Sequence, residues 1–172
     1  MKRIAMAATC AVAAALLTAG TSGCSSGKGE KPSATPTHAT KASTAAPSGT
    51  PKGPATVSLG SSKYGKILTD AKGRTLYLFE ADKSKKSTCT GTCAAAWPPL
   101  TTAGEPHAGK GIKAGLLGST KRSDGTTEVT YNNHPLYYYA GDKKPGDTNG
   151  QELNQFGAEW YVLTASGKKT EG

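Results

Sequence analysis

A short pattern of alternating apolar and aromatic positions occurs twice in this chain. Residues 76–82 read Leu-Tyr-Leu-Phe-Glu-Ala-Asp, and residues 136–142 read Leu-Tyr-Tyr-Tyr-Ala-Gly-Asp. Each copy is followed by a segment that ends in one of the only two tryptophans of the chain, Trp97 and Trp160. Repeats of this kind are typical of architectures in which each unit covers the apolar face of its neighbour. The pattern therefore predicts one domain made of two related units.

The alternation within each copy indicates a strand that is covered on both faces. Successive side chains of a strand point to opposite faces, so Tyr77 and Phe79 share one face and Leu76 and Leu78 share the other. The second copy repeats this with Tyr137 and Tyr139 opposite Leu136 and Tyr138. Both faces are apolar or aromatic, as expected for a central strand. We expect the tyrosines to lie mainly in the core, with their phenol groups hydrogen-bonded near its edges.

Further strands and turns complete an all-β prediction. The expected strands are residues 66–70, 75–79, 115–120, 126–131, 135–139 and 160–164. Asn132-Asn133 tolerates positive φ and suits a tight type I′ turn, whereas residues 71–74 read as a hairpin loop. Short helical turns are expected at residues 93–97 and 151–156. The fold class is thus all-β, with two pseudo-symmetric hairpin repeats and one or two short helical turns.

The N-terminal part has the composition of a leader and a tether. Residues 1–23 combine a basic start with an alanine-rich apolar stretch too short for a membrane span, which indicates a secretory signal peptide. Thr21-Ser22-Gly23 before Cys24 is similar to a lipobox, so we expect Cys24 to be lipidated; the alternative is an ordinary signal with a chance cysteine. Residues 24–56 are rich in Ser, Thr, Pro and Lys, and too few apolar side chains offset their ordering entropy. They are predicted to be a disordered tether.

The rest of the chain bounds the domain and its partners. The β domain is expected at 57–166, with repeats at about 64–100 and 126–164 and a frayed tail at 167–172. The whole chain carries a net charge of +9, but residues 57–172 hold 15 basic against 11 acidic residues. They contain no basic run with interleaved aromatics, which excludes a nucleic-acid partner. We expect a monomer anchored by lipid to the outer face of the cell membrane, with a cell-envelope partner or a small ligand.

The cysteines give one expected disulfide and one alternative. Cys10 leaves with the signal peptide and Cys24 carries lipid, so Cys89 and Cys93 remain as an even pair in an oxidising compartment. The bland interpretation is a disulfide that closes a five-residue loop. The alternative uses the Cys-x3-Cys spacing with a histidine, His107 or His134, as a copper site or a thiol-redox pair. No cofactor is expected under the first interpretation.

Asp82 and Asp142 end the two aromatic segments. Each carboxylate starts a loop, where an Asp side chain commonly accepts backbone N–H bonds from the residues that follow. The alternative is that both carboxylates converge across a pseudo-twofold axis and bind a cation or act as an acid/base pair. The sequence favours the turn or cap.

These motifs resemble a family of bacterial predicted lipoproteins that carry a tandem secreted repeat of unknown function with a Tyr-x-aromatic-x-x-Asp signature. The signature occurs at Tyr77, Phe79 and Asp82, and again at Tyr137, Tyr139 and Asp142. The segments 89–100 and 145–150 are also similar to parts of the family's first and second repeat. The resemblance covers roughly residues 60–165. It implies an envelope lipoprotein, and it implies no activity.

No motif of the chain indicates catalysis. There is no Gly-x-Ser-x-Gly, no phosphate-binding glycine loop and no carboxylate pair with a recognisable spacing. The aromatic band is expected to form much of the core or to line a groove between the repeats; its members are Tyr77, Phe79, Trp97, Tyr137, Tyr139 and Trp160. We therefore expect a non-enzymatic, membrane-anchored binding module, with the metal-handling or redox lipoprotein as the alternative.

Overall fold

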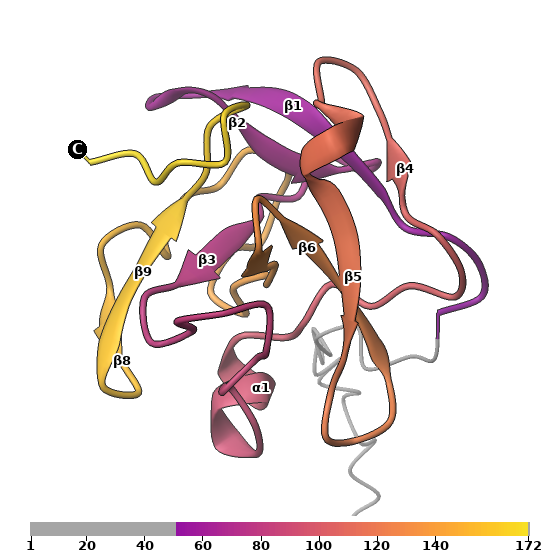
Figure 1. Cartoon of the computed structure of the whole chain (residues 1–172). Helices are drawn as coiled ribbons and strands as arrows, with labels where there is room; N and C mark the ends of the chain where they lie inside the picture. Colours follow the sequence, from indigo (N-terminus) through magenta and orange to yellow (C-terminus); the bar gives the residue numbers. More distant parts are fainter. Residues whose placement is uncertain (1–50, 172) are drawn as a thin grey trace, which may run out of the picture. The chain divides into compact units, whose positions relative to one another are not determined.

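A computed structural model describes residues 51–171 (Figure 1). The predicted signal peptide, the lipidation site Cys24 and the tether up to residue 50 lie outside the described residues. The described part consists mainly of strands in three small sheets, which confirms the all-β prediction. No helix in it is long and apolar enough to cross a membrane.

The first sheet belongs to the first repeat. Strands β1 (Thr56–Ser62) and β2 (Gly65–Asp70) form an antiparallel hairpin, and the short β4 (His107–Ala108) runs parallel to β1. Just before β1, the carbonyl of Gly53 accepts a hydrogen bond from the Ala103 N–H, so the ordered fold starts before residue 57. Pattern analysis missed β1 because its sequence alternates small polar residues with only two aliphatic ones.

The second sheet repeats this hairpin in the second half of the chain. After a 3₁₀ turn at Ala114–Leu116, strands β5 (Leu117–Lys121), β6 (Thr127–Tyr131) and β7 (His134–Pro135) form an antiparallel meander. Asn132 and Asn133 join β6 to β7 with φ values of 49° and 66°. Two successive positive φ values are the mark of a type I′ turn, which confirms that prediction.

The third sheet joins the two repeats. Strand β3 (Tyr77–Phe79) pairs antiparallel with β9 (Ala158–Val162), which also pairs with β8 (Asn154–Gln155). The aromatic strand of repeat 1 therefore lies beside the last strand of repeat 2, as Figure 1 shows. The expected hairpin of residues 66–70 with 75–79 is only partly formed, through the bridge between Thr69 and Thr75. Side-chain alternation identifies a strand but not its partner.

The segment after Trp97 in repeat 1 pairs in the same way with the aromatic segment of repeat 2. Tyr138 donates its N–H to the Pro98 carbonyl over 2.8 Å, and Leu100 donates its N–H to the Leu136 carbonyl over 2.8 Å. The chain after Trp97 thus lies along the aromatic segment of repeat 2, as β9 lies along β3. Each repeat supplies the strand that completes the other.

One helical prediction is confirmed and the other is wrong. Helix α1 (Thr92–Ala96) lies at the expected turn and stops before Pro98-Pro99. The second expected turn, residues 151–156, instead leads into the β8–β9 hairpin. Phe156 and Gly157 form its two-residue turn with φ values of 58° and 92°. An aromatic residue is unusual at this position, which favours Asn, Asp or Gly, so sequence reasoning missed the turn.

Two cores lie on opposite faces of the aromatic segments. One contains the leucine side, with Leu76, Leu78, Leu136 and Tyr138, and the other contains Tyr77, Phe79, Tyr137 and both tryptophans. The predicted two-faced burial is therefore confirmed. Residues 167–171 do not fray as expected, because Thr170 donates its N–H to the Val162 carbonyl and Lys169 forms a β-bridge with Leu163.

Candidate functional site

The two repeat motifs meet at a pseudo-twofold axis. Tyr77 and Tyr137 lie opposite each other in a single antiparallel bridge, with N–H to carbonyl distances of 2.9 and 3.0 Å in the two directions. The two residues occupy the same position in their motifs, so the axis passes between their backbones. Segments 60 residues apart in the chain are thus brought face to face.

The side chains of the motifs cross this axis. The Tyr77 hydroxyl donates to Asp142 Oδ2 over 2.8 Å, and the Tyr137 hydroxyl donates to Asp82 Oδ2 over 2.6 Å. Burial and the nearby carboxylates hold the pKa of both phenols far above the usual value, so both stay donors. The tyrosine of each motif therefore binds the aspartate of the other motif. We refer to these two contacts as the Tyr77 crossing and the Tyr137 crossing.

The aromatic band follows the same symmetry. Phe79, Trp160, Trp97 and Tyr139 stack in this order, with ring centroids 4.1, 3.9 and 4.3 Å apart. Tyr77 and Tyr137 contact the tryptophan of their own repeat edge-on. Both tryptophans and both of these tyrosines are fully buried. The band lies mainly in the core, and Phe79 at its end also lines a surface hollow between the repeats.

The two aspartates serve as loop caps, as the sequence favoured. Asp82 Oδ1 accepts the N–H and the hydroxyl of Thr88, over 2.7 and 2.6 Å. Asp142 Oδ1 accepts the N–H of Asn149 over 2.9 Å. Each carboxylate is thus used by its own loop and by the opposite tyrosine. The structure does not join them into one acid/base or cation site.

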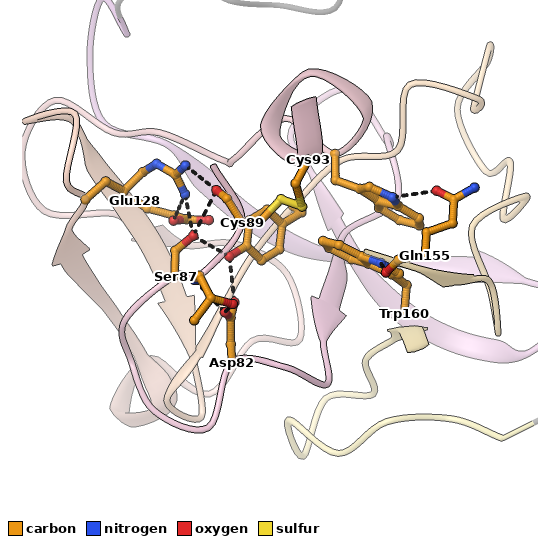
Figure 2. The surroundings of a disulfide bond; sticks show 11 residues. Asp82, Ser87, Cys89, Cys93, Glu128, Gln155 and Trp160 are labelled. Atoms are coloured by element: carbon orange, nitrogen blue, oxygen red, sulfur yellow. Dashed lines mark hydrogen bonds and ion pairs between the residues drawn. A yellow bond between two sulfur atoms is a disulfide. The ribbon is translucent and has the colours of Figure 1, made fainter. Parts of the chain in front are cut away.

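Figure 2 shows a buried polar network beside the disulfide of Cys89 and Cys93. The disulfide is formed as expected, and both cysteines are buried. Arg122 donates to the Cys89 carbonyl over 2.7 Å, to Ser87 Oγ over 2.6 Å and to Glu128 Oε2 over 2.6 Å. Ser87 Oγ lies 2.6 Å from the Tyr137 hydroxyl, so the network reaches the Tyr137 crossing.

Sequence reasoning missed the buried pair of Arg122 and Glu128. Glu128 is fully buried, and its Oε1 has no hydrogen-bond partner among the described residues. Burial outweighs the attraction of Arg122 and raises the pKa of Glu128 to about 8. The only available signal was a carboxylate inside the predicted strand 126–131. The pair is closed to solvent and serves as an internal brace.

The metal candidates are not gathered into a site. His107 is exposed on β4, whereas His134 is half-buried on β7, where burial lowers its pKa. Cys89 and Cys93 are bonded to each other rather than to a histidine. Between residues 51 and 171, no three His, Cys, Asp or Glu side chains form a group that could hold a metal ion.

Two surface hollows flank the crossings. The first, of about 280 Å³, lies between the Asn132–His134 turn and the segment around Asp82; its lining is Phe79, Glu80, Asp82, Lys83, Ser84, Asn132, Asn133 and His134. The second, of about 210 Å³, lies between the residue 71–74 loop and the segment around Asp142; its lining is Lys72, Arg74, Asp142, Lys143, Lys144 and Pro145. We call them the mixed hollow and the basic hollow.

The two hollows are equivalent under the pseudo-twofold axis. A shift of 60 residues places Asp82, Lys83 and Ser84 on Asp142, Lys143 and Lys144. The same shift places Lys72 on Asn132 and Arg74 on His134. Each hollow thus joins the hairpin turn of one repeat to the loop after the aspartate of the other. Sequence reasoning missed both, because it did not know which turn faces which loop.

Comparison with protein families identifies the repeats. A family model described as a secreted repeat of unknown function matches residues 58–101 and 118–164. The chain belongs to this family of secreted repeats. The matched segments start at residues 58 and 118, earlier than the predicted repeats, which start at about 64 and 126. Each matched segment includes part of a hairpin strand, β1 or β5, that the predicted repeat left out.

Membership in the family of secreted repeats gives a location but no activity. The description of the family is that of a secreted protein, so the chain functions outside the cytoplasm. No curated protein and no solved structure matches the chain. The function has to be argued from the site itself.

Proposed function

We propose that this secreted-repeat protein is a non-enzymatic binding module of the cell envelope, anchored by lipid at Cys24, and that its binding surface is the pair of hollows. The observation that carries the proposal is the contrast between a symmetric interior and an asymmetric rim. The crossings and the ring stack are repeated in both halves. The residues that line the hollows differ between the halves.

The interior supports a structural role for the motif. The crossing tyrosines are fully buried, each carboxylate is capped, and the hydroxyls remain protonated. The tyrosine hydroxyls are not free nucleophiles, and both carboxylates are already engaged as hydrogen-bond acceptors. The signature that marks the family therefore builds a scaffold, and ligand contacts fall to the hollows.

The anchor is tested by fractionation of the whole chain expressed with its leader in a bacterial host. Wild-type protein is expected in the membrane fraction, with the mass of acyl chains on residue 24. Cys24→Ala should release the protein in soluble form. Soluble wild-type protein with no added mass would contradict the lipid anchor and leave the binding proposal untouched.

The binding surface is tested by blocking the hollows one at a time. The chain from residue 24 onward, with Cys24→Ser, is sedimented with isolated cell-envelope material. Lys144→Trp fills the basic hollow, and Ser84→Trp fills the mixed hollow at the equivalent position. Glu105→Trp, at an exposed residue outside both hollows, is the matched control. Loss of sedimentation in at least one blocked variant, but not in the control, is expected.

Two outcomes would contradict this function. Full sedimentation of both blocked variants would show that the hollows are not the binding surface. Release of soluble envelope fragments that grows with time and protein concentration would show catalysis, and the non-enzymatic proposal would fail. Thermal unfolding of each variant followed by far-UV circular dichroism confirms that the fold is intact, because the introduced tryptophan itself would contribute to the fluorescence.

A further inference from the structure

We infer that the basic hollow binds a phosphate-bearing anion, an inference that rests on the proposed function and names the ligand class of one of its two sites. Four cationic residues, Lys72, Arg74, Lys143 and Lys144, line a space of about 210 Å³. They come from two segments that the fold, and not the sequence, brings together. The Gly146 N–H donates to the Gly73 carbonyl over 3.1 Å and ties these two segments at the edge of the hollow.

Arg74 is held in place before any ligand arrives. Its Nε donates to Asp70 Oδ2 over 2.8 Å and its Nη2 to the Tyr138 hydroxyl over 2.9 Å, while the guanidinium lies over the Tyr138 ring at 4.0 Å. The side chain remains about one-third exposed, and Nη1 takes part in none of these bonds. A planar guanidinium with a fixed orientation and a free edge is well suited to oxyanion recognition.

The lysines add charge to a rigid loop. Asp147 Oδ2 accepts the backbone N–H groups of Lys143 and Lys144, over 2.9 and 3.1 Å, which fixes the loop while leaving the Lys144 ammonium unpaired by any described carboxylate. Lys72 lies in the facing turn, and its backbone N–H is likewise held by Asp70. Both lysine side chains are exposed at the rim. Their removal should therefore cost charge without disturbing the fold.

Nearby carboxylates limit the affinity of the basic hollow for an anion, but the net charge of the hollow stays positive. Asp142 lies in the hollow, where Tyr77 and Asn149 already donate to its oxygens. Asp70 and Asp147 stand behind it and neutralise part of the charge. Four cations against three carboxylates leave a net charge of +1, so binding is expected to be modest and to weaken with salt.

The equivalent hollow provides the contrast within the same molecule. Three of the four cationic positions carry other residues there: Asn132 in place of Lys72, His134 in place of Arg74 and Ser84 in place of Lys144. Burial lowers the pKa of His134, which keeps it neutral. Glu80 adds a negative charge at the mixed hollow. The difference in charge is therefore a property of the basic hollow rather than of the fold.

A phosphate group fits this set of donors better than a carboxylate. A phosphate group is tetrahedral, and with its ester oxygens, which accept more weakly, it presents acceptors in several directions, whereas a carboxylate presents two oxygens in one plane. Donors approach the basic hollow from two opposite loops, so a ligand with oxygens on several sides can contact both. Phosphodiesters of an envelope polymer and phospholipid headgroups share this chemistry.

The test is a site-resolved titration of the chain from residue 24 onward with Cys24→Ser. Inorganic phosphate is added while the amide resonances of Gly73 and Gly146, on the two walls, are followed by NMR. Saturable shifts at these two glycines are expected. In Lys72→Gln/Lys144→Gln the binding should weaken about tenfold, because two charges are lost. Lys85→Gln/Lys86→Gln removes the same charge from the equivalent exposed loop and should bind as wild type.

Three results would overturn the inference. They are no saturable shift at the two glycines, equal weakening in both double variants, and displacement of phosphate by acetate at equal concentration. If phosphate causes no saturable shift while wild-type protein still sediments with envelope material, the phosphate site fails and the binding function survives through the mixed hollow. If neither wild-type protein nor any variant sediments with envelope material, the proposed binding function fails instead.

Two further probes separate the sources of the phosphate. A soluble poly(glycerol phosphate) represents an envelope polymer, and vesicles of phosphatidylcholine with phosphatidylglycerol represent a membrane. Competition by the polymer alone assigns the site to a phosphodiester chain, and competition by the vesicles alone assigns it to a headgroup. Failure of both to compete with inorganic phosphate would overturn the envelope ligand.

Discussion

The Tyr77 and Tyr137 crossings share one geometry but differ in their support. Asp82, the acceptor of Tyr137, is only 5% exposed and starts a loop that contains the disulfide and accepts hydrogen bonds from Arg122 at Ser87 and Cys89. Asp142, the acceptor of Tyr77, is partly exposed, and its loop is held only by Asp147 and by hydrogen bonds to its backbone. The hydrogen bond from tyrosine to aspartate is repeated in both crossings, but the loops that support it differ.

This difference separates two tasks within one symmetric scaffold. The braced crossing lies beside the buried Arg122–Glu128 pair and beside a loop closed by a disulfide, and both restrict its motion. The open crossing lies beside the basic hollow, which is rimmed by lysines, and the braced crossing lies beside the mixed hollow. An internal repeat thus allows the two copies to share one interior geometry while the surroundings of each crossing differ.

Removal of the buried Arg122–Glu128 brace is expected to cause the largest loss of stability. Glu128→Leu leaves the Arg122 guanidinium buried without its carboxylate, and we expect the free energy of unfolding to fall by about 3–5 kcal/mol. Urea unfolding followed by tryptophan fluorescence measures the loss. Arg122→Met/Glu128→Leu should recover most of it, because no unpaired charge remains. A double variant as unstable as the single one would mean that the bonds of Arg122 to Cys89 and Ser87 matter more than its charge.

The same pair predicts a pH dependence of the stability. The pKa of Glu128 is about 8 in the folded protein and 4.5 when the group is exposed, so the folded state holds this proton more tightly. Stability should therefore fall as pH rises from about 4.5 to about 8 and change little above. Glu128→Gln should flatten this part of the profile. A wild-type stability that rises over this window would refute the assignment.

Loss of the disulfide should affect only the braced crossing. Cys89→Ser/Cys93→Ser opens a five-residue loop, and the expected loss is about 2 kcal/mol. Combined with Tyr137→Phe the losses should be non-additive, because both act on the loop that follows Asp82. Combined with Tyr77→Phe they should add. Equal non-additivity with both tyrosine variants would contradict the proposal that the disulfide supports only the Tyr137 crossing.

Single hydroxyl deletions compare the crossings directly. Tyr137→Phe removes a donor from buried Asp82 and the contact with Ser87, for an expected loss of about 1–3 kcal/mol. Tyr77→Phe removes a donor from Asp142, which solvent can partly replace, for about 0.5–1.5 kcal/mol. Chemical denaturation of the two variants measures the difference. The comparison fails if Tyr77→Phe is the more damaging.

The smallest effect is expected at Phe156, which matches Cys93 in its distance before the tryptophan. Phe156 is 48% exposed and adopts a positive φ in a type I′ turn. Phe156→Asn should stabilise the protein by about 0.5–1 kcal/mol, because Asn suits this conformation and no buried contact is lost. Thermal unfolding measures the gain. A destabilised variant would show that the exposed ring packs in solution.

The sequence predicted the strands better than their partners. The alternation through Leu76 to Phe79 correctly placed tyrosines on one face and leucines on the other, because that periodicity is local. Local patterns could not show that β3 pairs with β9 rather than β2. The disulfide and the capping role of Asp82 were accessible from short-range spacing. The crossings and both hollows depend on contacts between the repeats, which a single sequence does not encode in any readable spacing, and so do the bonds of Arg122 to Ser87 and Cys89.

The exchange of strands between the repeats has a consequence for export. Strand β3 belongs to the first repeat, but its partner β9 belongs to the second. A chain that emerges from a membrane with its N-terminus first therefore exposes the aromatic strand β3 before β9 has followed. The third sheet can form only after both repeats have been released.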